Sequence, residues 1–200
     1  MKLFKGTYKN DPDEQLMLKV ANGDASAFEV IYDRYNGPLM GYFYRMLWQD
    51  REKAEDFVQD LFTKIIHKPH LYDPKRPFKT WLYSVANNMC KNEYRKQEVR
   101  KGTNNSIDAG VQVKDDNANP SGNVDLSNFS QALEDALNEL EDKHRQVFIL
   151  RFKMNLSIKE IADTMDISDG TVKSRIFYCL KKLSAQLADF DPAKKEELYG

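Results

Sequence analysis

Apolar residues recur every three or four positions along most of this chain, which is the spacing of one face of an α-helix. The clearest stripe lies between residues 54 and 66, and it consists of Ala54, Phe57, Val58, Leu61, Phe62, Ile65 and Ile66. Similar stripes are predicted near residues 16–20, 28–47, 78–89, 129–140 and 147–152. The pattern favours an all-α fold.

Residues that start and stop helices separate these stripes. Asp11 is predicted to cap the first helix, with Pro12 at the first helical position. Gly23 is expected to end that helix, because glycine adopts the left-handed backbone at helix ends. Asp24 and Asp50 are predicted to cap the next two helices.

Prolines are expected to break the helical pattern at two places. Gly37-Pro38 should bend or interrupt the second helix, because proline lacks an amide hydrogen and clashes with the preceding turn. Three further prolines forbid a continuous helix between residues 67 and 77. That segment is predicted to be a stiff loop, with Tyr72, Lys75 and Arg76 available at its surface.

The segment from residue 157 to residue 183 has the pattern of a helix-turn-helix. Ser157 and Glu160 fit a capping box, and Ser168 fits a second N-cap after a short break at residues 166–168. The buried faces are predicted to consist of Ile158, Ile161, Ala162 and Met165 in the first helix and of Val172, Ile176, Leu180 and Leu183 in the second.

The outer face of the second helix is basic and aromatic. Residues 169–183 contain four basic side chains and one acidic side chain. A helix-turn-helix places its second helix in the major groove, where Lys, Arg, Ser and Thr reach bases or phosphates. Two amphipathic helices with a solvated basic face would also explain the stripes. The run Thr171-Val172-Lys173-Ser174-Arg175 favours DNA binding over that alternative.

Acidic side chains cover the outer face of the helix predicted to begin after Asp50. They are Asp50, Glu52, Glu55, Asp56 and Asp60. An ordinary solvated face and a docking surface for a basic partner both explain this composition. The residues alone do not choose between the two interpretations.

Residues 78–101 combine an apolar stripe with a basic end. The side chains predicted to point inward are Phe78, Trp81, Leu82, Val85, Ala86 and Met89. The cations that follow are Lys91, Arg95, Lys96, Arg100 and Lys101. Rings, amides and cations together suit nucleic acid, because bases stack on rings and phosphates pair with cations. Trp81 equally fits an ordinary core tryptophan.

The chain changes character between residues 103 and 127, which are rich in Asn, Asp and Gly and lack a helical stripe. A structureless stretch of this length is unusual inside a compact domain, so we predict a flexible linker. Two small helical domains are therefore expected, at residues 1–102 and 128–200.

Composition narrows the classes of function. The net charge is only −1, so basic residues must be judged by their clustering. No nucleophile–base set or phosphate loop stands out, and we expect neither enzymatic activity nor a cofactor.

Cys90 and Cys179 match no metal spacing and are expected to be half-buried thiols of a reduced cytoplasmic protein. The N-terminus lacks an apolar run long enough for a signal peptide or membrane span.

Three stretches together resemble one known family. Residues 54–62 (AEDFVQDLF) resemble the polymerase-docking helix of the extracytoplasmic-function (group four) sigma factors, in the sigma-70 superfamily of bacterial RNA polymerase. Residues 78–88 (FKTWLYSVANN) resemble the promoter-melting helix of that family, and residues 171–177 (TVKSRIF) its recognition helix. The resemblance covers nearly the whole chain, with region 2 in the first half and region 4 in the second.

The resemblance implies a transcription initiation factor that binds core RNA polymerase, through its beta-prime and beta subunits, and promoter DNA. The residues that would face the coiled coil of beta-prime are Glu55, Asp56, Gln59 and Asp60. Those that would contact the upstream (minus-thirty-five) element are Arg151, Thr171, Lys173, Ser174, Arg175, Phe177 and Tyr178. Those that would contact or melt the downstream (minus-ten) element are Lys79, Trp81, Asn88, Lys91 and Arg95.

Within this scheme, the loop before Phe78 would capture an extruded base, and Asn88 would contact the non-template strand. Many members are held by an anti-sigma protein, so such an inhibitor is a further partner that the resemblance suggests. Membrane insertion is not expected.

Two other classes of function stay open at this point. A stand-alone helix-turn-helix regulator normally dimerises to match two half-sites. No long heptad is visible here, and half of the chain would have no role. A helical nucleic-acid enzyme is disfavoured by the missing catalytic set.

Overall fold

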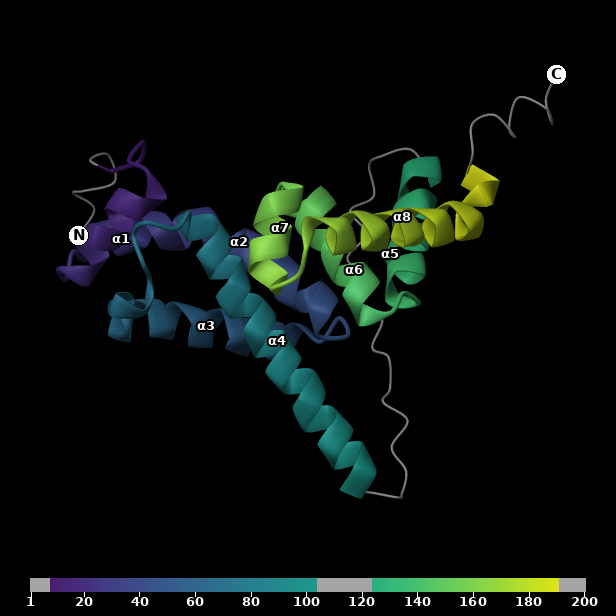
Figure 1. The fold of residues 1–200 in the computed structure, drawn as a ribbon, viewed down its shortest axis with the longest axis horizontal. Helices are drawn as coiled ribbons and strands as arrows, with labels where there is room; N and C mark the ends of the chain where they lie inside the picture. The colour runs from purple at the N-terminus through teal and green to yellow at the C-terminus, as the bar shows by residue number, and fades with distance from the viewer. Residues whose placement is uncertain (1–7, 104–123, 191–200) are drawn as a thin grey trace.

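The computed structural model describes residues 8–103 and 124–190, and every regular element within them is a helix (Figure 1). The all-α prediction is confirmed for this part of the chain. The first unit contains α1 (Asp13–Ala21), α2 (Ala25–Met46), α3 (Arg51–His67), the 3₁₀ turn η1 (Pro69–Leu71) and α4 (Phe78–Thr103). The second contains α5 (Val124–Asn138), α6 (Asp142–Phe148), the π turn η2 (Ile149–Lys153), α7 (Ile158–Met165), α8 (Asp169–Gln186) and the 3₁₀ turn η3 (Ala188–Phe190).

Side-chain caps fix most of the predicted helix starts. Asp24 accepts hydrogen bonds from the amides of residues 26 and 27, and Asp50 accepts one from the amide of residue 53. The capping box of Ser157 and Glu160 is formed in both directions, at 3.2 and 2.7 Å. Ser168 caps α8, and the preceding turn places Asp166 in the left-handed region at φ 57°. Aspartate is among the few non-glycine residues that adopt this conformation readily.

One predicted helix boundary in the first unit is wrong, and one predicted interruption does not occur. Pro12, and not Asp11, is the N-cap residue of α1, while the Asp11 carboxylate forms an ion pair with Lys19 at 2.6 Å. Pro38 does not interrupt α2, which continues to Met46. The helix loses one backbone hydrogen bond at Pro38. It is held on both sides of the proline by buried side chains, among them Tyr35 and Leu39.

The core of the first unit forms where α1, α3 and α4 pack around α2. Its fully buried side chains include Leu16, Ile31, Phe43, Leu61, Phe78 and Leu82. The predicted stripe of α3 is buried or half-buried except at its end, where Ile66 is 47% exposed. The second unit has a small cluster of its own, made of Ala136, Leu137, Leu140, Phe148, Cys179 and Leu183.

The predicted apolar stripes of the second unit are exposed at three positions, which are Phe129, Phe152 and Leu180. Leu180 is 43% exposed, because the face of α8 that packs inward passes through Cys179 and Leu183. Phe152 is 46% exposed and packs against Phe148 at a ring-centroid distance of 4.8 Å. Both thiols, of Cys90 and Cys179, are fully buried and not half-buried as expected.

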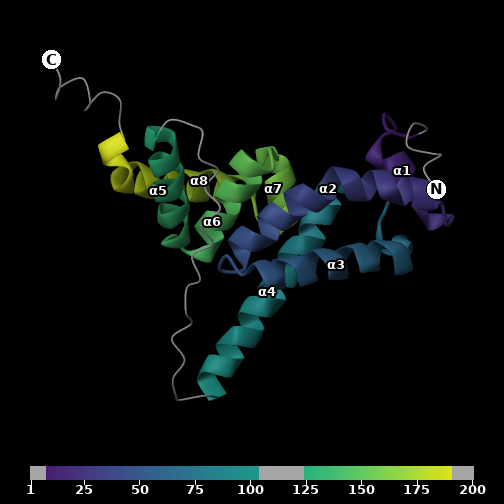
Figure 2. The same cartoon turned by 180° about the vertical axis from the view of Figure 1, so that it is seen from behind.

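The two units pack against each other, which the sequence did not indicate. Helix α7 lies beside the first half of α4, and the two views agree on this arrangement (Figures 1 and 2). One apolar cluster continues from Tyr42 and Tyr83 in the first unit to Leu150, Met154 and Ile161 in the second. The C-terminal half of α4 projects away from this shared core (Figure 1).

Most of the predicted linker lies outside the described residues, and α5 begins at Val124, within the predicted range 103–127. None of the helices in the described ranges combines the length and the apolar character needed to cross a membrane.

Candidate nucleic-acid and polymerase interface

The predicted recognition surface lies on the outer face of α8. Lys173, Ser174, Phe177 and Tyr178 are exposed, whereas Thr171 and Arg175 are half-buried. The Ser174 hydroxyl donates to the carbonyl of Thr171 at 3.0 Å, and the Thr171 hydroxyl lies 2.9 Å from that of Ser168. Both hydroxyls are therefore occupied within the helix, and the lysine and the two aromatic rings are the groups that project most freely.

Phe177 and Tyr178 are unusually exposed for aromatic side chains, at 63% and 58%. Their rings lie against each other with centroids 5.5 Å apart in an edge-to-face arrangement. Large exposed apolar side chains that lie next to each other commonly mark an interaction site. On a helix that presents Lys173 beside them, apolar contact with thymine methyl groups is a suitable use.

Arg151 lies in η2, on a different element from α8. Its guanidinium donates to the carbonyl of Leu156 at 2.9 Å, which ties the π turn to the segment before α7. The side chain is nevertheless exposed. Its exposed part therefore remains able to contact a phosphate.

The residues predicted to act on the downstream element are spread along α4. Asn88, Lys91 and Arg95 are exposed, while Lys79 and Trp81 are half-buried. The Trp81 ring packs on those of Tyr72 and Phe78, at centroid distances of 5.2 and 5.7 Å. This tryptophan is therefore part of the core packing and also partly open to solvent.

The loop before α4 is built differently from the prediction at Tyr72. This side chain is buried, and its hydroxyl donates to the carbonyl of Arg76 at 2.7 Å. Burial, together with the nearby Glu14 carboxylate, raises the pKa of Tyr72 to about 12, so the hydroxyl keeps its proton at neutral pH. The loop is held by this bond as well as by its prolines, and its exposed side chains are those of residues 73–77.

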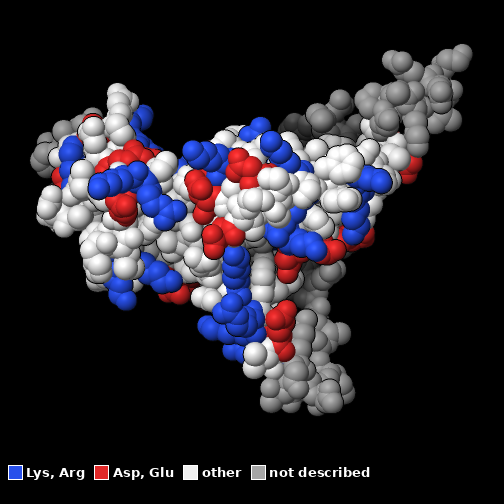
Figure 3. Space-filling view, in the orientation of Figure 1, with Lys and Arg blue, Asp and Glu red and all other residues white. Residues whose placement is uncertain are grey.

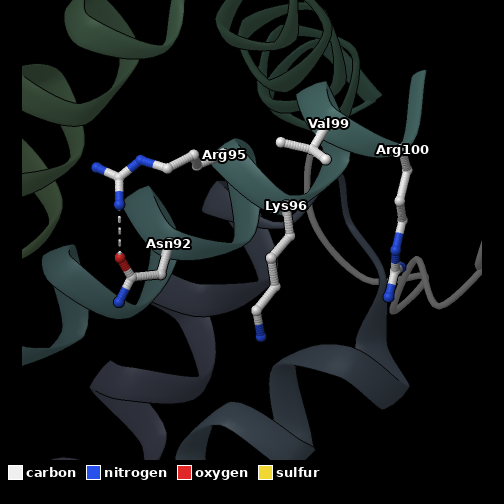
Figure 4. A pocket seen from close by; sticks show the side chains of 5 residues that line it. All are labelled: Asn92, Arg95, Lys96, Val99 and Arg100. Carbon is white, nitrogen blue, oxygen red and sulfur yellow. Dashed lines mark hydrogen bonds between the residues drawn. The ribbon is translucent and has the colours of Figure 1, made fainter. Parts of the chain in front are cut away.

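The projecting end of α4 carries a basic hollow of about 510 Å³. Its lining side chains are Asn92, Arg95, Lys96, Val99 and Arg100 (Figure 4). The amide oxygen of Asn92 accepts a hydrogen bond from Arg95 at 3.4 Å. Asn92 was not among the predicted DNA residues, although it lies between the cations Lys91 and Arg95 and could have been found from that position.

The base of this projecting segment is anchored by an ion pair. Lys53 of α3 lies 2.7 Å from the Glu93 carboxylate, and the Tyr94 hydroxyl donates to the carbonyl of Met46 at 2.6 Å. Burial alone would raise the pKa of Glu93, but the Lys53 ammonium outweighs it and holds the pKa below its ordinary value. The carboxylate is therefore ionised at neutral pH and fixes the direction in which the basic end of α4 projects.

The acidic face of α3 is exposed, as the polymerase-docking prediction requires. Glu55, Asp56, Gln59 and Asp60 all lie at the surface, and Glu55 pairs with Arg51 at 3.1 Å. An apolar patch on α2 and α3 was not predicted. The ring of Tyr32, 40% exposed, lies 4.7 Å from that of Phe62, and Ile66 is exposed one turn further along α3.

The charged side chains are unevenly distributed over the face shown in Figure 3. Lysine and arginine gather over the projecting end of α4, and further basic groups lie over the second unit and over the end of the first unit that carries α1. Between them the surface is mixed. The near-zero net charge of the chain therefore conceals several separate basic surfaces, which suit contact with DNA phosphates.

Comparison with known proteins assigns both units to one family. The family profile "Sigma-70 region 2" matches residues 31–100, and "Sigma-70, region 4" matches residues 136–185. The ECF RNA polymerase sigma factor SigW of Bacillus subtilis is 33% identical over 186 residues, which are 88% of this chain and 99% of that protein. The ECF RNA polymerase sigma-E factor of Haemophilus influenzae is 30% identical over 173 residues, which are 82% of this chain and 89% of that protein.

Solved structures share the fold. CnrH in complex with the cytosolic domain of CnrY matches with a TM-score of 0.66 at 24% identity, covering 90% of this chain and 99% of CnrH. The sigma factor RpoE of Bartonella quintana, in complex with the anti-sigma factor NepR, matches with a TM-score of 0.63 at 23% identity, covering 88% and 96%. The chain belongs to the extracytoplasmic-function sigma factors of the sigma-70 family, which direct RNA polymerase to promoters.

Proposed function

We propose that this sigma factor divides promoter recognition between α8 and α4, and docks on core RNA polymerase through α3. The observation that carries this proposal is the exposure of three chemically distinct surfaces on three helices. They are the Lys173-centred face of α8, the basic face of α4 and the acidic face of α3. No single surface would suffice for an initiation factor, because polymerase and two promoter elements must be held together.

Region 4 contacts the upstream element through α8. Lys173 and Arg175 reach base edges from the N-terminal half of the helix, the part of a recognition helix that enters the major groove. Phe177 and Tyr178 supply apolar contact. Arg151 contacts a phosphate, which positions the domain and carries no sequence information.

Region 2 contacts the downstream element through α4 and the loop before it. Asn88 is exposed, and its amide donates and accepts at once, as base edges require. Trp81 and Lys79 lie near the start of the helix, while Lys91, Arg95 and the basic hollow follow the DNA backbone beyond it. The loop at residues 73–77 is preset by Pro74, Pro77 and the Tyr72 bond, so little entropy is lost when it closes on an extruded base.

Polymerase docking uses α3 and its neighbour. Asp56 and Asp60 lie four residues apart and therefore on one face of the helix. The adjacent patch of Tyr32 and Ile66 provides apolar area, which an acidic face lacks. The proposed partner surface on the beta-prime subunit is accordingly basic with an apolar centre.

The protein acts in the cytoplasm, where promoter DNA and polymerase are found. The similar structures of CnrH and RpoE were solved with CnrY and with the anti-sigma factor NepR. A protein inhibitor of this kind is therefore proposed for this chain as well.

Size-exclusion chromatography with core RNA polymerase tests the proposal. The chain should co-elute with core polymerase, and the mixture should start transcripts at defined positions on DNA selected from a random-sequence library. A dimer that binds such DNA tightly without polymerase, and does not co-elute with it, would instead indicate a stand-alone regulator.

A further inference from the structure

A pocket of about 330 Å³ lies between helical elements that are far apart in the sequence. Residues of α2, α4, η2 and the segment just after η2 line it. Its volume falls at the lower end of the range for sites that bind small molecules, which is about 300–1,000 Å³. No carboxylate lies among its lining residues in the described part of the chain. The pocket can therefore admit a small ligand without placing it against a negative charge.

The floor of the pocket is aromatic and apolar. Tyr35, Tyr83 and Met154 are buried there, and the Pro38 ring is exposed beside them. The Tyr35 hydroxyl donates to Asp13 and the Tyr83 hydroxyl donates to the sulfur of Met154 at 2.9 Å, so both hydroxyls already have partners. Burial raises the pKa of both hydroxyls, and neither is charged at neutral pH. The floor therefore offers uncharged ring surface to a planar group.

The rim of the pocket is basic. Arg34 and Lys79 are half-buried there, whereas Lys153 and Asn155 are exposed. The Arg34 guanidinium is already paired with the Asp13 carboxylate. The two lysines are therefore the cations that remain for a ligand.

Lys153 is held only weakly by the protein. Its ammonium lies 3.8 Å from an oxygen of the Glu134 carboxylate. The Arg45 guanidinium contacts the same oxygen at 2.9 Å and so neutralises this carboxylate more directly. An anion in the pocket would be a closer partner for Lys153 than Glu134 is.

Lys79 is the rim cation that the protein satisfies least. It forms no ion pair with any carboxylate in the described ranges. Glu160 is near enough to be affected by its charge, but that carboxylate accepts a hydrogen bond from the Ser157 amide at 2.7 Å. A cation that is half-buried without a partner loses hydration, and a bound anion would compensate for that loss.

Asn155 supplies a neutral donor beside the two lysines. Its backbone is left-handed, at φ 54°, a conformation that asparagine adopts more readily than most residues. Its side-chain amide forms no hydrogen bond with the described residues and is free to donate. The rim thus combines two cations with an uncharged donor, a set that suits phosphate oxygens.

We propose that this pocket binds a small phosphorylated compound with a planar ring, of the size of a nucleoside diphosphate. Lys79, Lys153 and the Asn155 amide hold the phosphates, because hydrogen bonds from ammonium groups to phosphate oxygens are short and strong. The ring packs on the aromatic floor. Lys79 is also a proposed contact of the downstream element, so the site is tested by ligand binding to the free chain and not by transcription.

Isothermal titration calorimetry of the full chain with ADP tests the proposal. One ADP should bind with a Kd below about 1 mM at physiological salt. Inorganic pyrophosphate should bind more weakly, because it lacks the ring. Adenosine should not bind measurably, because it lacks the phosphates.

A pair of double variants locates the bound ADP. Lys79→Met with Lys153→Met removes both rim charges and keeps long side chains, and it should weaken ADP binding at least about tenfold. Lys64→Met with Lys159→Met makes the same charge change at exposed positions outside the pocket and should bind ADP like the wild type. Circular dichroism of each variant checks that the helices are retained.

Asn155→Asp is a further test, because it places a negative charge on the rim without changing the size of the side chain. Aspartate also tolerates the left-handed backbone. This variant should lose ADP affinity by about tenfold or more, since the new carboxylate repels the phosphates.

Three results would overturn the proposal. Equal ADP affinities in the two double variants would place the bound ADP elsewhere on the protein. Pyrophosphate that binds as tightly as ADP would show that the floor holds no ring. If the wild type does not bind ADP, but the Lys79→Met, Lys153→Met variant loses affinity for a single-stranded oligodeoxynucleotide, the rim serves DNA phosphates instead.

Discussion

Helices α4 and α8 both carry proposed DNA contacts, but they are held in the molecule in different ways. Helix α8 is anchored by one stripe, with Val172, Cys179 and Leu183 buried, and its outer face is free. Helix α4 is buried on two sides, against the core of region 2 and against region 4, and only a strip that includes Asn88 is exposed before the helix projects into solvent. A recognition surface can thus lie on a helix that is anchored along one side or on a helix that is anchored along two sides.

The largest effect is expected from the single stripe that anchors α8. Leu183→Ala should lower the free energy of unfolding by about 2–5 kcal/mol, because it leaves a cavity at a buried position. Leu180→Ala removes the same atoms from a side chain that is 43% exposed, and should cost much less. Urea unfolding of the two variants measures the difference. Equal losses would mean that the burial of α8 is not confined to one stripe.

Substitutions on the outer face of α8 and a substitution of Arg151 should differ in their effect on base preference. Lys173→Ala and Arg175→Ala should each cost about 1–3 kcal/mol of upstream-element binding by the holoenzyme and relax base preference locally. Arg151→Ala should weaken binding to all upstream-element sequences evenly and make the affinity less dependent on salt concentration. A binding scan over upstream-element variants distinguishes these outcomes, and sequence-blind losses at all three positions would refute the base-reading assignment.

Asn87 and Asn88 form a matched pair of adjacent amides on α4. Asn87→Ala should destabilise the free protein by about 1–3 kcal/mol, since it leaves buried polar groups of region 4 without a partner. Asn88→Ala should change stability by less than about 0.5 kcal/mol but reduce promoter opening. Chemical denaturation and permanganate reactivity of thymines near the start site measure the two effects. Normal opening by a folded Asn88→Ala would leave the melting role of this residue without support.

Charge reversal on the acidic face of α3 should weaken binding to core polymerase and leave the free energy of unfolding nearly unchanged. Asp56→Lys with Asp60→Lys should weaken core polymerase binding at least about tenfold, or about 1.4 kcal/mol. The unfolding free energy should change by no more than about 0.5 kcal/mol for each substitution. Glu29→Lys with Asp33→Lys makes the same charge change at exposed positions four residues apart on α2. Equal losses in the two double variants would show that net charge, and not the α3 surface, is responsible.

The smallest effect is expected in the loop before α4. Tyr72→Phe removes the hydroxyl that donates to Arg76 at 2.7 Å and should cost about 1 kcal/mol of stability. Replacement of residues 73–76 by Gly and Ser, with Tyr72 kept, should leave polymerase binding nearly unchanged and reduce promoter opening. Full opening by that variant would show that loop stiffness is not required.

The contrast between α4 and α8 also explains which features the sequence revealed. The capping box at Ser157, the cap at Ser168 and the turn before α8 depend on neighbouring residues, and they could be predicted from spacing alone. The second face of α4 could not, because Asn87 is buried by Thr164 and Gln146, which lie 77 and 59 residues away. Tyr72 was predicted at the surface for the same reason, since its burial depends on packing against Phe78 and Trp81.

The prediction was less accurate where two neighbouring residues could serve the same role, as the cap of a helix or as its buried position. Pro12 took the N-cap position that Asp11 was expected to hold, and Cys179 took the buried position expected for Leu180. In α8 the buried stripe is shifted by one residue from the predicted stripe, so Cys179 faces inward and Leu180 does not. Periodicity alone does not fix which residues of α8 face inward, because packing against α5 and α6 determines it.

The central claim is that this sigma factor recognises promoters only when polymerase fixes its two regions. Footprinting of a selected promoter fragment, with the protein alone and with core polymerase at physiological salt, tests it most directly. The account predicts weak, largely sequence-blind binding by the free protein, because nothing holds its two DNA-binding surfaces at the separation of the two promoter elements. With polymerase it predicts specific protection of both elements, since linked sites gain through effective concentration. Tight, sequence-specific protection of both elements by the free protein would contradict it.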